Sequence, residues 1–309
     1  MKTAVLAGGT GGAKLAAGLQ EVIGADLSVV ANTGDDIEAL GVHVSPDPDL
    51  ITYWLSGEID ERRGWGIRDD TSTVFERLVR LGEPDWFRLT DRDLATCLRR
   101  RHLLDKGTRP TEAQLGIASA LGVAARVLPM SDQPVRTRVR TPDGWRAFQD
   151  YLVLDRAEPP IEAVEFDGAD AARPTPEVIE ALAAAEAIVI GPSNPVISIG
   201  AILAVPGIRE AISRGSAPVV SVSPFVAGRA IKGPTEKFMQ AIGQRPSASG
   251  VAAAYGDLLD GMVVDAADPD PAPDSPRSIG IPTLMDDAPA RRRVAERTLE
   301  FAAELATGR

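Results

Sequence analysis

The first part of the chain alternates between short apolar runs and turns. An apolar run at 3–7 leads into a glycine-rich segment at 8–14, and residues 15–23 have the composition of a helix. A second apolar run at 27–31 ends in the sequence Asn-Thr-Gly-Asp-Asp at 32–36. This order of strand, glycine turn, helix, strand and acidic tip predicts a nucleotide-binding α/β unit.

The middle of the chain has a different pattern. The loop at 37–44 runs into the turn Ser-Pro-Asp-Pro-Asp at 45–49, which its two prolines are expected to stiffen, with Asp49 as the N-cap of the next helix. Apolar spacing predicts helices at 50–55, 71–81, 94–104 and 111–121. Alternation predicts strands at 124–129, 135–139 and 145–154. We therefore expect a smaller mixed α/β insertion subdomain at 51–165.

Strands alternate with helices again beyond residue 165. Strands are expected at 187–190, 218–222, 261–265 and 279–284, helices at 176–185, 208–213, 235–242, 250–259 and 288–306, and a Pro/Asp-rich loop at 268–274. Such alternation predicts a Rossmann-like, mostly parallel sheet with helices on both faces. The nucleotide-binding core is expected to comprise 1–50 and 166–309.

Composition narrows the function classes. The net charge of −11 argues against a general nucleic-acid surface, because phosphate contacts need clustered Lys and Arg. The lone cysteine, Cys97, excludes an internal disulfide and fits a reducing cytoplasm. We see no signal peptide and no apolar run of about 18 residues, so we expect neither secretion nor a membrane span.

Four polar segments follow predicted strands, at 8–12, 35–36, 191–194 and 223–224. The carboxyl ends of parallel strands meet at one edge of a sheet, so these four segments are expected to share one crevice.

The glycine segment fits no standard phosphate-binding pattern. Lys14 occupies the third glycine position of a dinucleotide fingerprint, and Leu15 stands where a phosphate loop has Ser or Thr. A generic nucleotide or phosphate cradle is the favoured interpretation. A tight structural turn is the alternative.

Carboxylates gather after the second strand, as Asp35, Asp36, Asp47 and Asp49. A few carboxylates together with substrate phosphates are how magnesium is usually held. The alternative is that these residues are N-caps and solvated loop carboxylates.

Other polar groups have stronger structural alternatives. The loop at 191–195 offers donors to a phosphate, but it is also a typical Ser/Asn turn. Structural roles are favoured for Asp91–Asp93, for Ser131 with Asp132, and for His43, His102 and Cys97. Arg88 is expected to be a surface residue, and the arginines at 291–293 are expected to form a solvated helix face.

Taken together, these segments resemble one family. Matching stretches lie at 8–12, 32–36, 45–49, 64–66, 91–96, 129–132, 148–150, 191–195 and 223–224, in the family's order. In these motifs the chain is similar to the 2-phospho-L-lactate transferases of coenzyme F-420 biosynthesis, including their phosphoenolpyruvate-using actinobacterial members.

The resemblance implies a reaction and a set of site residues. It implies Mg²⁺-dependent transfer of a phospho-three-carbon-acid group from a guanosine-diphosphate-activated donor to the deazaflavin Fo, with release of GMP, by a homodimer. Asp35 and Asp49 match metal and catalytic positions, Asp49 and Arg88 match deazaflavin contacts, and Asp36 or Asp49 is a candidate general base. The implied ligand-binding residues are Gly9, Thr10, Gly11, Gly12, Lys14, Asp47, Arg88, Asp91, Arg92, Ser131, Asp132, Gly191, Ser193, Asn194 and Ser223.

The chain departs from the family at Cys97, where histidine is frequent, and at Pro48, where leucine is usual. A nucleotide-sugar-binding regulator similar to the gluconeogenesis factors is a second hypothesis, but it would carry a different acidic run after the second strand. A nicotinamide oxidoreductase is disfavoured by Lys14.

Overall fold

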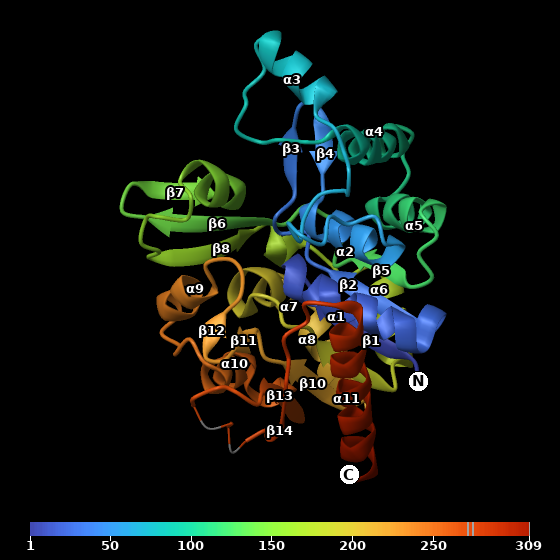
Figure 1. The fold of residues 1–309 in the computed structure, drawn as a ribbon, viewed down its shortest axis with the longest axis vertical. Coiled ribbons are helices and arrows are strands. Elements are labelled where there is room, and N and C mark those ends of the chain that lie inside the picture. The colour runs from blue at the N-terminus through green and yellow to red at the C-terminus, as the bar shows by residue number, and fades with distance from the viewer. Residues whose placement is uncertain (271, 274, 309) are drawn as a thin grey trace.

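The computed structural model describes residues 1–270, 272–273 and 275–308. Its centre is a 7-stranded parallel sheet in the order β14-β13-β10-β9-β1-β2-β5 (Figure 1). The strands are β1 (Thr3–Ala7), β2 (Leu27–Ala31), β5 (Arg126–Pro129), β9 (Ala187–Ile190), β10 (Val219–Val222), β13 (Gly261–Asp265) and β14 (Arg277–Ile281). The predicted Rossmann-like sheet is confirmed.

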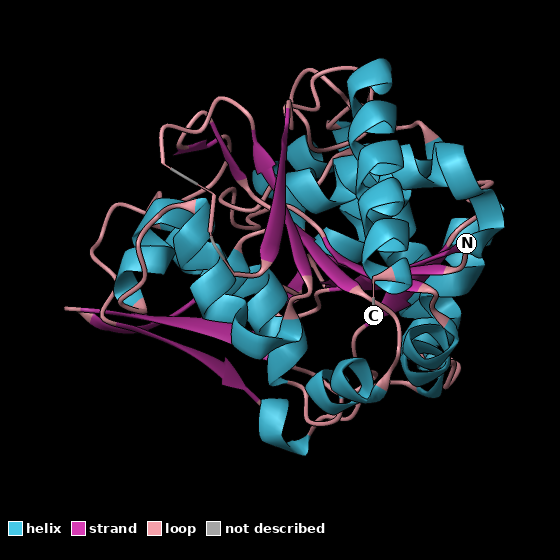
Figure 2. Cartoon of the chain, turned by 90° about the horizontal axis from the view of Figure 1, so that it is seen from below, coloured by secondary structure: helices cyan, strands magenta, loops and turns pink. Residues whose placement is uncertain are grey.

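Helices cover both faces of the sheet (Figure 2). Alternate residues of β1 face opposite ways: Ala4 and Leu6 belong to one hydrophobic core, Val5 and Ala7 to the other. The second core packs against α1 (Gly9–Ile23), α2 (Pro46–Ser56) and α11 (Ala288–Thr307). The first packs against α6 (Pro176–Ala184), α7 (Gly200–Ala204), α8 (Ile208–Arg214), α9 (Thr235–Ala241) and α10 (Ala248–Tyr255).

The strand order reverses beside β1. Val5 pairs with Val29 of β2 on one side and with Val189 of β9 on the other. A ligand crevice in such a sheet forms where the order reverses, outside the carboxyl ends of the strands. The segments after β1 and β9 are therefore placed at the expected crevice.

Two segments near the acidic tip differ from their predictions. The expected loop at 37–44 is a hairpin of β3 (Ile37–Ala39) and β4 (Val42–Val44). Helix α2 begins at Pro46, not at residue 50, because proline is well suited to the first helical position. Asp49 is therefore inside the first turn and is not the N-cap.

The rest of the middle segment forms three helices and a small sheet. These are α3 (Thr73–Arg80), α4 (Asp91–Asp105) and α5 (Pro110–Ala120), with the antiparallel strands β6 (Arg136–Thr141), β7 (Gly144–Ala147) and β8 (Ala163–Asp167). The strand predicted at 145–154 ends at Ala147, and a helical turn follows at Asp150–Leu154 because Tyr151 turns inward against Phe238. Strand β5, from the range predicted as an insertion, is an edge strand of the main sheet.

Two smaller observations complete the fold. A short hairpin joins β11 (Phe225–Val226) to β12 (Arg229–Ala230). The loop expected at 268–274 includes positions 271 and 274, which lie outside the described residues. In the described part of the chain no single helix has the length and apolar character of a membrane span, although one bent pair, 195–204 with 208–214, passes on length and composition.

Candidate functional site

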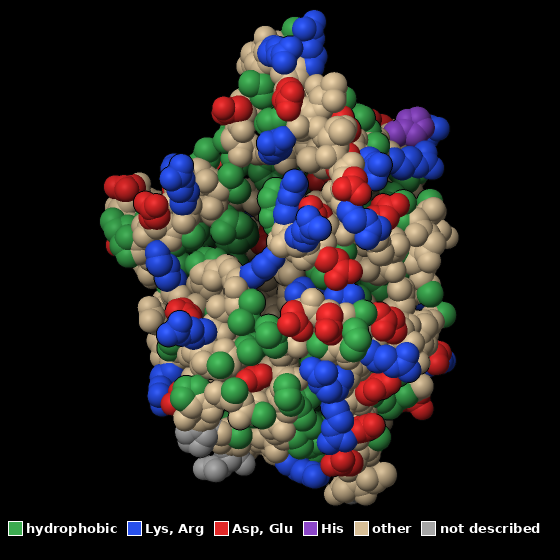
Figure 3. All heavy atoms as spheres, viewed as in Figure 1, with side chains coloured by type: hydrophobic (Ala, Val, Ile, Leu, Met, Phe, Trp, Pro, Cys, Tyr) green, Lys and Arg blue, Asp and Glu red, His purple; other side chains and the backbone are tan. Residues whose placement is uncertain are grey.

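A cavity of about 430 Å³ opens at the carboxyl ends of the central strands. Residues from all four predicted segments line it, among them Gly9, Asp35, Ser193 and Ser223. The prediction that these segments share one crevice is confirmed. Figure 3 shows a hollow on this face, between the body and the part that carries β6–β8, with Lys and Arg side chains at its edge.

The glycine segment forms the first turn of α1 and packs tightly on the loop after β9. The Gly8 N–H donates to Ser193 Oγ at 3.0 Å. A Cβ on Gly11 would lie 2.1 Å from the Pro192 carbonyl oxygen, and one on Gly12 would lie 2.5 Å from Ser193 Oγ. The glycines therefore serve close packing, Gly8 and Gly11 also line the cavity, and the nucleotide or phosphate cradle stays a prediction.

Replacement of Gly11 tests this packing. Gly11→Ala is expected to destabilise the fold by about 1–3 kcal/mol, because its Cβ would meet a backbone atom that cannot move aside. Gly116→Ala is the matched control: its Cβ would meet nothing within 4 Å in the middle of α5, so a gain of about 0.5–1 kcal/mol is expected. Urea unfolding of both variants measures the difference, and equal stabilities would contradict the packing role.

Asp47 ties helix α2 to the glycine segment. Its Oδ1 accepts the Gly9 N–H at 2.7 Å and its Oδ2 accepts the Asn32 amide at 2.9 Å. Burial raises the pKa of Asp47 to about 6, although both hydrogen bonds oppose the rise. The Asn32 side-chain oxygen, Oδ1, in turn accepts the Gly34 N–H at 2.7 Å, which fixes the acidic tip.

Asp35 is the carboxylate of the acidic tip that lines the cavity. It is buried, and its Oδ1 has no hydrogen-bond partner among the described residues. Burial, and after it the charge of Asp47, raises the pKa of Asp35 well above its usual value. Two neighbouring buried carboxylates that lack a countercharge fit a hard divalent cation.

Asp36 and Asp49 point elsewhere, and neither lines this cavity. Asp49 forms a buried ion pair with Arg100, which contacts both of its carboxylate oxygens and also donates to Gln114 at 3.1 Å. Asp36 accepts from Ser45 Oγ at 2.8 Å and lies 3.0 Å from His43 Nε2.

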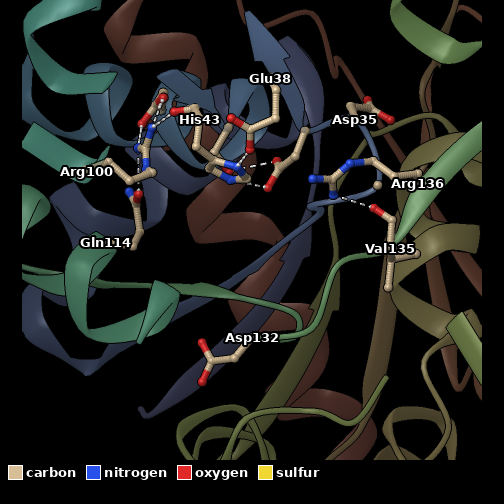
Figure 4. A network of polar contacts seen from close by, with 12 residues as sticks. Asp35, Glu38, His43, Arg100, Gln114, Asp132, Val135 and Arg136 are labelled. Carbon is tan, nitrogen blue, oxygen red and sulfur yellow. Dashed lines mark hydrogen bonds and ion pairs between the residues drawn. The ribbon is translucent and has the colours of Figure 1, made fainter. Parts of the chain in front are cut away.

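Figure 4 shows the polar contacts around Arg100 and His43, which lie at a distance from Asp35. Glu38 lies beside His43, and Gln114 lies beside Arg100. His43 Nδ1 lies 2.8 Å from a Glu38 carboxylate oxygen. Burial opposes a charge on His43, but the contacts with Asp36 and Glu38 outweigh it and raise the pKa of the imidazole.

One further group of potential ligand atoms lies beside Asp49. Asp49, Asp93 and Cys97 each place one such atom within 4.8 Å of the others. Arg100 already occupies the Asp49 carboxylate, and the Tyr53 hydroxyl donates to Asp93 at 2.9 Å. Burial raises the pKa of the Cys97 thiol, which fits its predicted structural role.

Ser131 and Asp132 line a second cavity of about 250 Å³, together with Asp36 and His43. The Asp132 carboxylate accepts the Thr111 N–H at 2.8 Å and so holds the start of α5.

Arg88, Asp91 and Arg92 line neither of these two cavities. Asp91, which lies in the first turn of α4, accepts the Val74 N–H at 3.0 Å and so binds the start of α3. Arg88 donates to Ser72 Oγ at 2.6 Å and Arg92 to the Arg68 carbonyl at 3.3 Å.

The loops after β9 and β10 also mix structural and cavity roles. Asn194 lines the cavity, and its side-chain oxygen accepts the Val196 N–H at 2.9 Å. Ser223 also lines it, and its hydroxyl accepts the Phe225 N–H at 3.2 Å. Gly191 does not line the cavity: its Cβ would lie 3.2 Å from Gly12 Cα, so it serves the close packing of the two loops.

Two lysines line the cavity, and only one of them was a predicted site residue. Lys14 lines it and donates to the Met285 carbonyl at 2.7 Å. Lys232, which no sequence pattern singled out, lines it too. Burial, and after it the charge of Lys232, lowers the pKa of Lys14. The two ammonium groups therefore lie close enough to repel each other.

A sequence model of the 2-phospho-L-lactate transferase CofD family matches residues 3–278. The chain belongs to this family. A phosphoenolpyruvate transferase of Kitasatospora aureofaciens is 42% identical over 100% of both chains. A 2-phospho-L-lactate transferase of Methanosarcina mazei is 40% identical over 85% of this chain and 87% of its own. Membership makes the protein a transferase and supports phosphotransferase activity in coenzyme F-420 biosynthesis.

The fold has a solved counterpart. A protein of the UPF0052 family from Bacillus halodurans superposes with a TM-score of 0.63 over 96% of this chain and 98% of its own, at 19% identity. At that identity the likeness concerns the fold alone.

Proposed function

We propose that this CofD-family protein transfers a phospho-three-carbon-acid group from a guanosine-diphosphate-activated acid to the ribitol hydroxyl of the deazaflavin Fo, and releases GMP. The acceptor oxygen attacks the phosphorus attached to the acid and gives up its proton to water, and the bond from that phosphorus to the GMP oxygen breaks. Such phosphoryl chemistry asks the protein mainly to position its substrates and to stabilise charge.

The observation that carries this proposal is that both kinds of charge line one cavity. Lys14 and Lys232 line it together with Asp35 and Asp47, and Asp47 accepts a hydrogen bond from Gly9 at the start of α1. A diphosphate bound in this cavity would find ammonium groups and backbone N–H groups as donors, and a carboxylate pair suited to its counterion.

Asp35 and Asp47 are the residues that would hold Mg²⁺. When bound there, Mg²⁺ neutralises the diphosphate and polarises the transferred phosphoryl group. Asp47 Oδ1 also accepts the Gly9 N–H at 2.7 Å. The side chain that would hold the metal therefore also positions the backbone of the glycine segment.

The three-carbon acid is the part of the donor to be tested first. Relatives that match over whole chains are named phosphoenolpyruvate transferases, which favours the enolpyruvyl form over phospholactate. Mass spectrometry of the product formed from Fo with each guanylylated acid in turn distinguishes the two, because the products differ by one double bond. Absence of product with every donor would contradict the proposed function.

The buried pair of Asp35 and Asp47 predicts that the stability of the fold depends on pH. The pKa of Asp47 is raised in the fold from 3.8 to about 6, so the folded protein binds a proton more tightly than the unfolded chain. Without metal, the stability should therefore fall as the pH rises from about 4 to about 6.

Mg²⁺ should reverse that loss, because it binds the ionised pair. The expected result is a larger rise in melting temperature on addition of MgCl₂ at pH 7 than at pH 5, with NaCl of equal ionic strength as the control. A rise that is the same at both pH values would contradict the assignment of the pair.

A further inference from the structure

Two segments that are far apart in the sequence meet beside the glycine segment. The Lys232 ammonium, on the loop between β12 and α9, donates to the Arg63 carbonyl oxygen at 2.6 Å. The next residue, Gly64, has its carbonyl oxygen 3.1 Å from the Thr10 hydroxyl, which donates to it. Lys232 thus joins its own loop to a segment that is bound to the start of α1.

Gly64 makes this approach possible. A Cβ at this position would lie 2.3 Å from Lys232 Nζ, and the backbone has a φ of +72°, which side chains other than hydrogen rarely tolerate. Glycine at 64 therefore satisfies both the backbone and the lysine contact.

The charge of Lys232 is not neutralised in this arrangement. Lys232 and Lys14 both line the cavity, and the hydrogen bonds of their ammonium groups go to the carbonyl oxygens of Arg63 and Met285. Within the described residues neither lysine has a carboxylate within ion-pair distance. Two cations held near each other by neutral acceptors favour an anion between them.

We propose that Lys232 is a further substrate-binding residue, whose ammonium binds the phosphate of the departing GMP. This rests on the proposed function. As the bond to the transferred phosphorus breaks, the bridging oxygen and its electron pair leave with GMP. Lys232 and Lys14 then stabilise the negative charge that gathers there.

The first experiment measures binding of inorganic pyrophosphate and of GMP by calorimetry. Lys232→Met should weaken both by about ten-fold, the worth of one charge-assisted hydrogen bond. Lys237→Met is the matched control, because that ammonium also donates to backbone carbonyls, of Ala157 and Glu158, but does not line the cavity. Unchanged affinities for Lys232→Met would overturn the inference.

Chemical rescue separates charge from folding. The native Cys97 is buried, so in Lys232→Cys the new thiol is the accessible one, and aminoethylation restores an ammonium there. Recovery of pyrophosphate affinity and of kcat on aminoethylation is expected, and failure to recover either would overturn the inference.

The outcomes also separate the two proposals. Wild-type protein that binds neither GMP nor pyrophosphate and transfers nothing to Fo contradicts the proposed function and, with it, the inference. Wild-type protein that transfers normally, with a Lys232→Met variant of equal kcat and KM, contradicts only the inference.

Discussion

Asp35→Asn is expected to lower kcat by about a thousand-fold or more while leaving the fold at least as stable as before. A bound cation supplies several kcal/mol of transition-state stabilisation, and about 4 kcal/mol corresponds to that factor. The fold should not suffer, because burial and the charge of Asp47 already disfavour the ionised form of Asp35. Steady-state kinetics at saturating Mg²⁺ and thermal unfolding measure the two effects.

Asp36→Asn is the matched control for this experiment. It makes the same change at the next residue, but the Asp36 carboxylate faces the second cavity and contacts Ser45 and His43. An asparagine oxygen can still accept from Ser45, so we expect a loss of activity below about ten-fold. If the Asp36 variant were the inactive one and the Asp35 variant retained its turnover, the metal pair proposed here would be wrong.

The sheet and its crevice could be predicted from the sequence because both depend on local patterns. Strands such as β9 are short apolar runs buried on both faces, and glycine or polar residues follow them directly. The carboxyl ends of parallel strands share one edge, so Asp35, Ser193 and Ser223 had to lie near one another. No long-range information was needed for that step.

The separate roles of Asp47 and Asp49 could not be predicted in the same way. Two residues apart in a rigid turn, they appear equivalent. In a helix, however, the side chains of residues two positions apart point in directions that differ by about 200° around the axis. Because α2 begins at Pro46, Asp47 faces the glycine segment and Asp49 faces α4. The start of the helix, which the sequence placed at residue 50 and the structure places at Pro46, therefore decides which way each carboxylate faces.

Lys232 and Arg100 were missed for a different reason. Each acts through a partner distant in the sequence: Lys232 bonds to Arg63, and Arg100 to Asp49. Isolated basic residues on a loop or within a charged helix carry no periodicity that distinguishes them from solvated ones. Only the packing of the chain brings these partners together.

Asp49→Ala is expected to lower the free energy of unfolding by about 3–5 kcal/mol, because it leaves the Arg100 charge buried without its partner. Both side chains are only 4% exposed, so water cannot replace the lost carboxylate. The resemblance to the family implies a catalytic role for Asp49. The Asp49→Ala variant would therefore lose activity whether Asp49 acts in the reaction or only holds the structure. Guanidinium unfolding of the variant measures the structural effect.

The double variant Asp49→Leu with Arg100→Met separates the two accounts. Replacing both charges by apolar groups of similar size removes the unpaired cation, and stability should return to within about 1–2 kcal/mol of the wild type. If the stable double variant turns over Fo normally, Asp49 acts only by anchoring α2 to α4 and so orienting Asp47. If it is stable and inactive, the Asp49 carboxylate or the Arg100 guanidinium itself takes part in the reaction, and the pair must open when substrate binds. A single Asp49→Ala variant as stable as the wild type would contradict the buried ion pair from which both expectations follow.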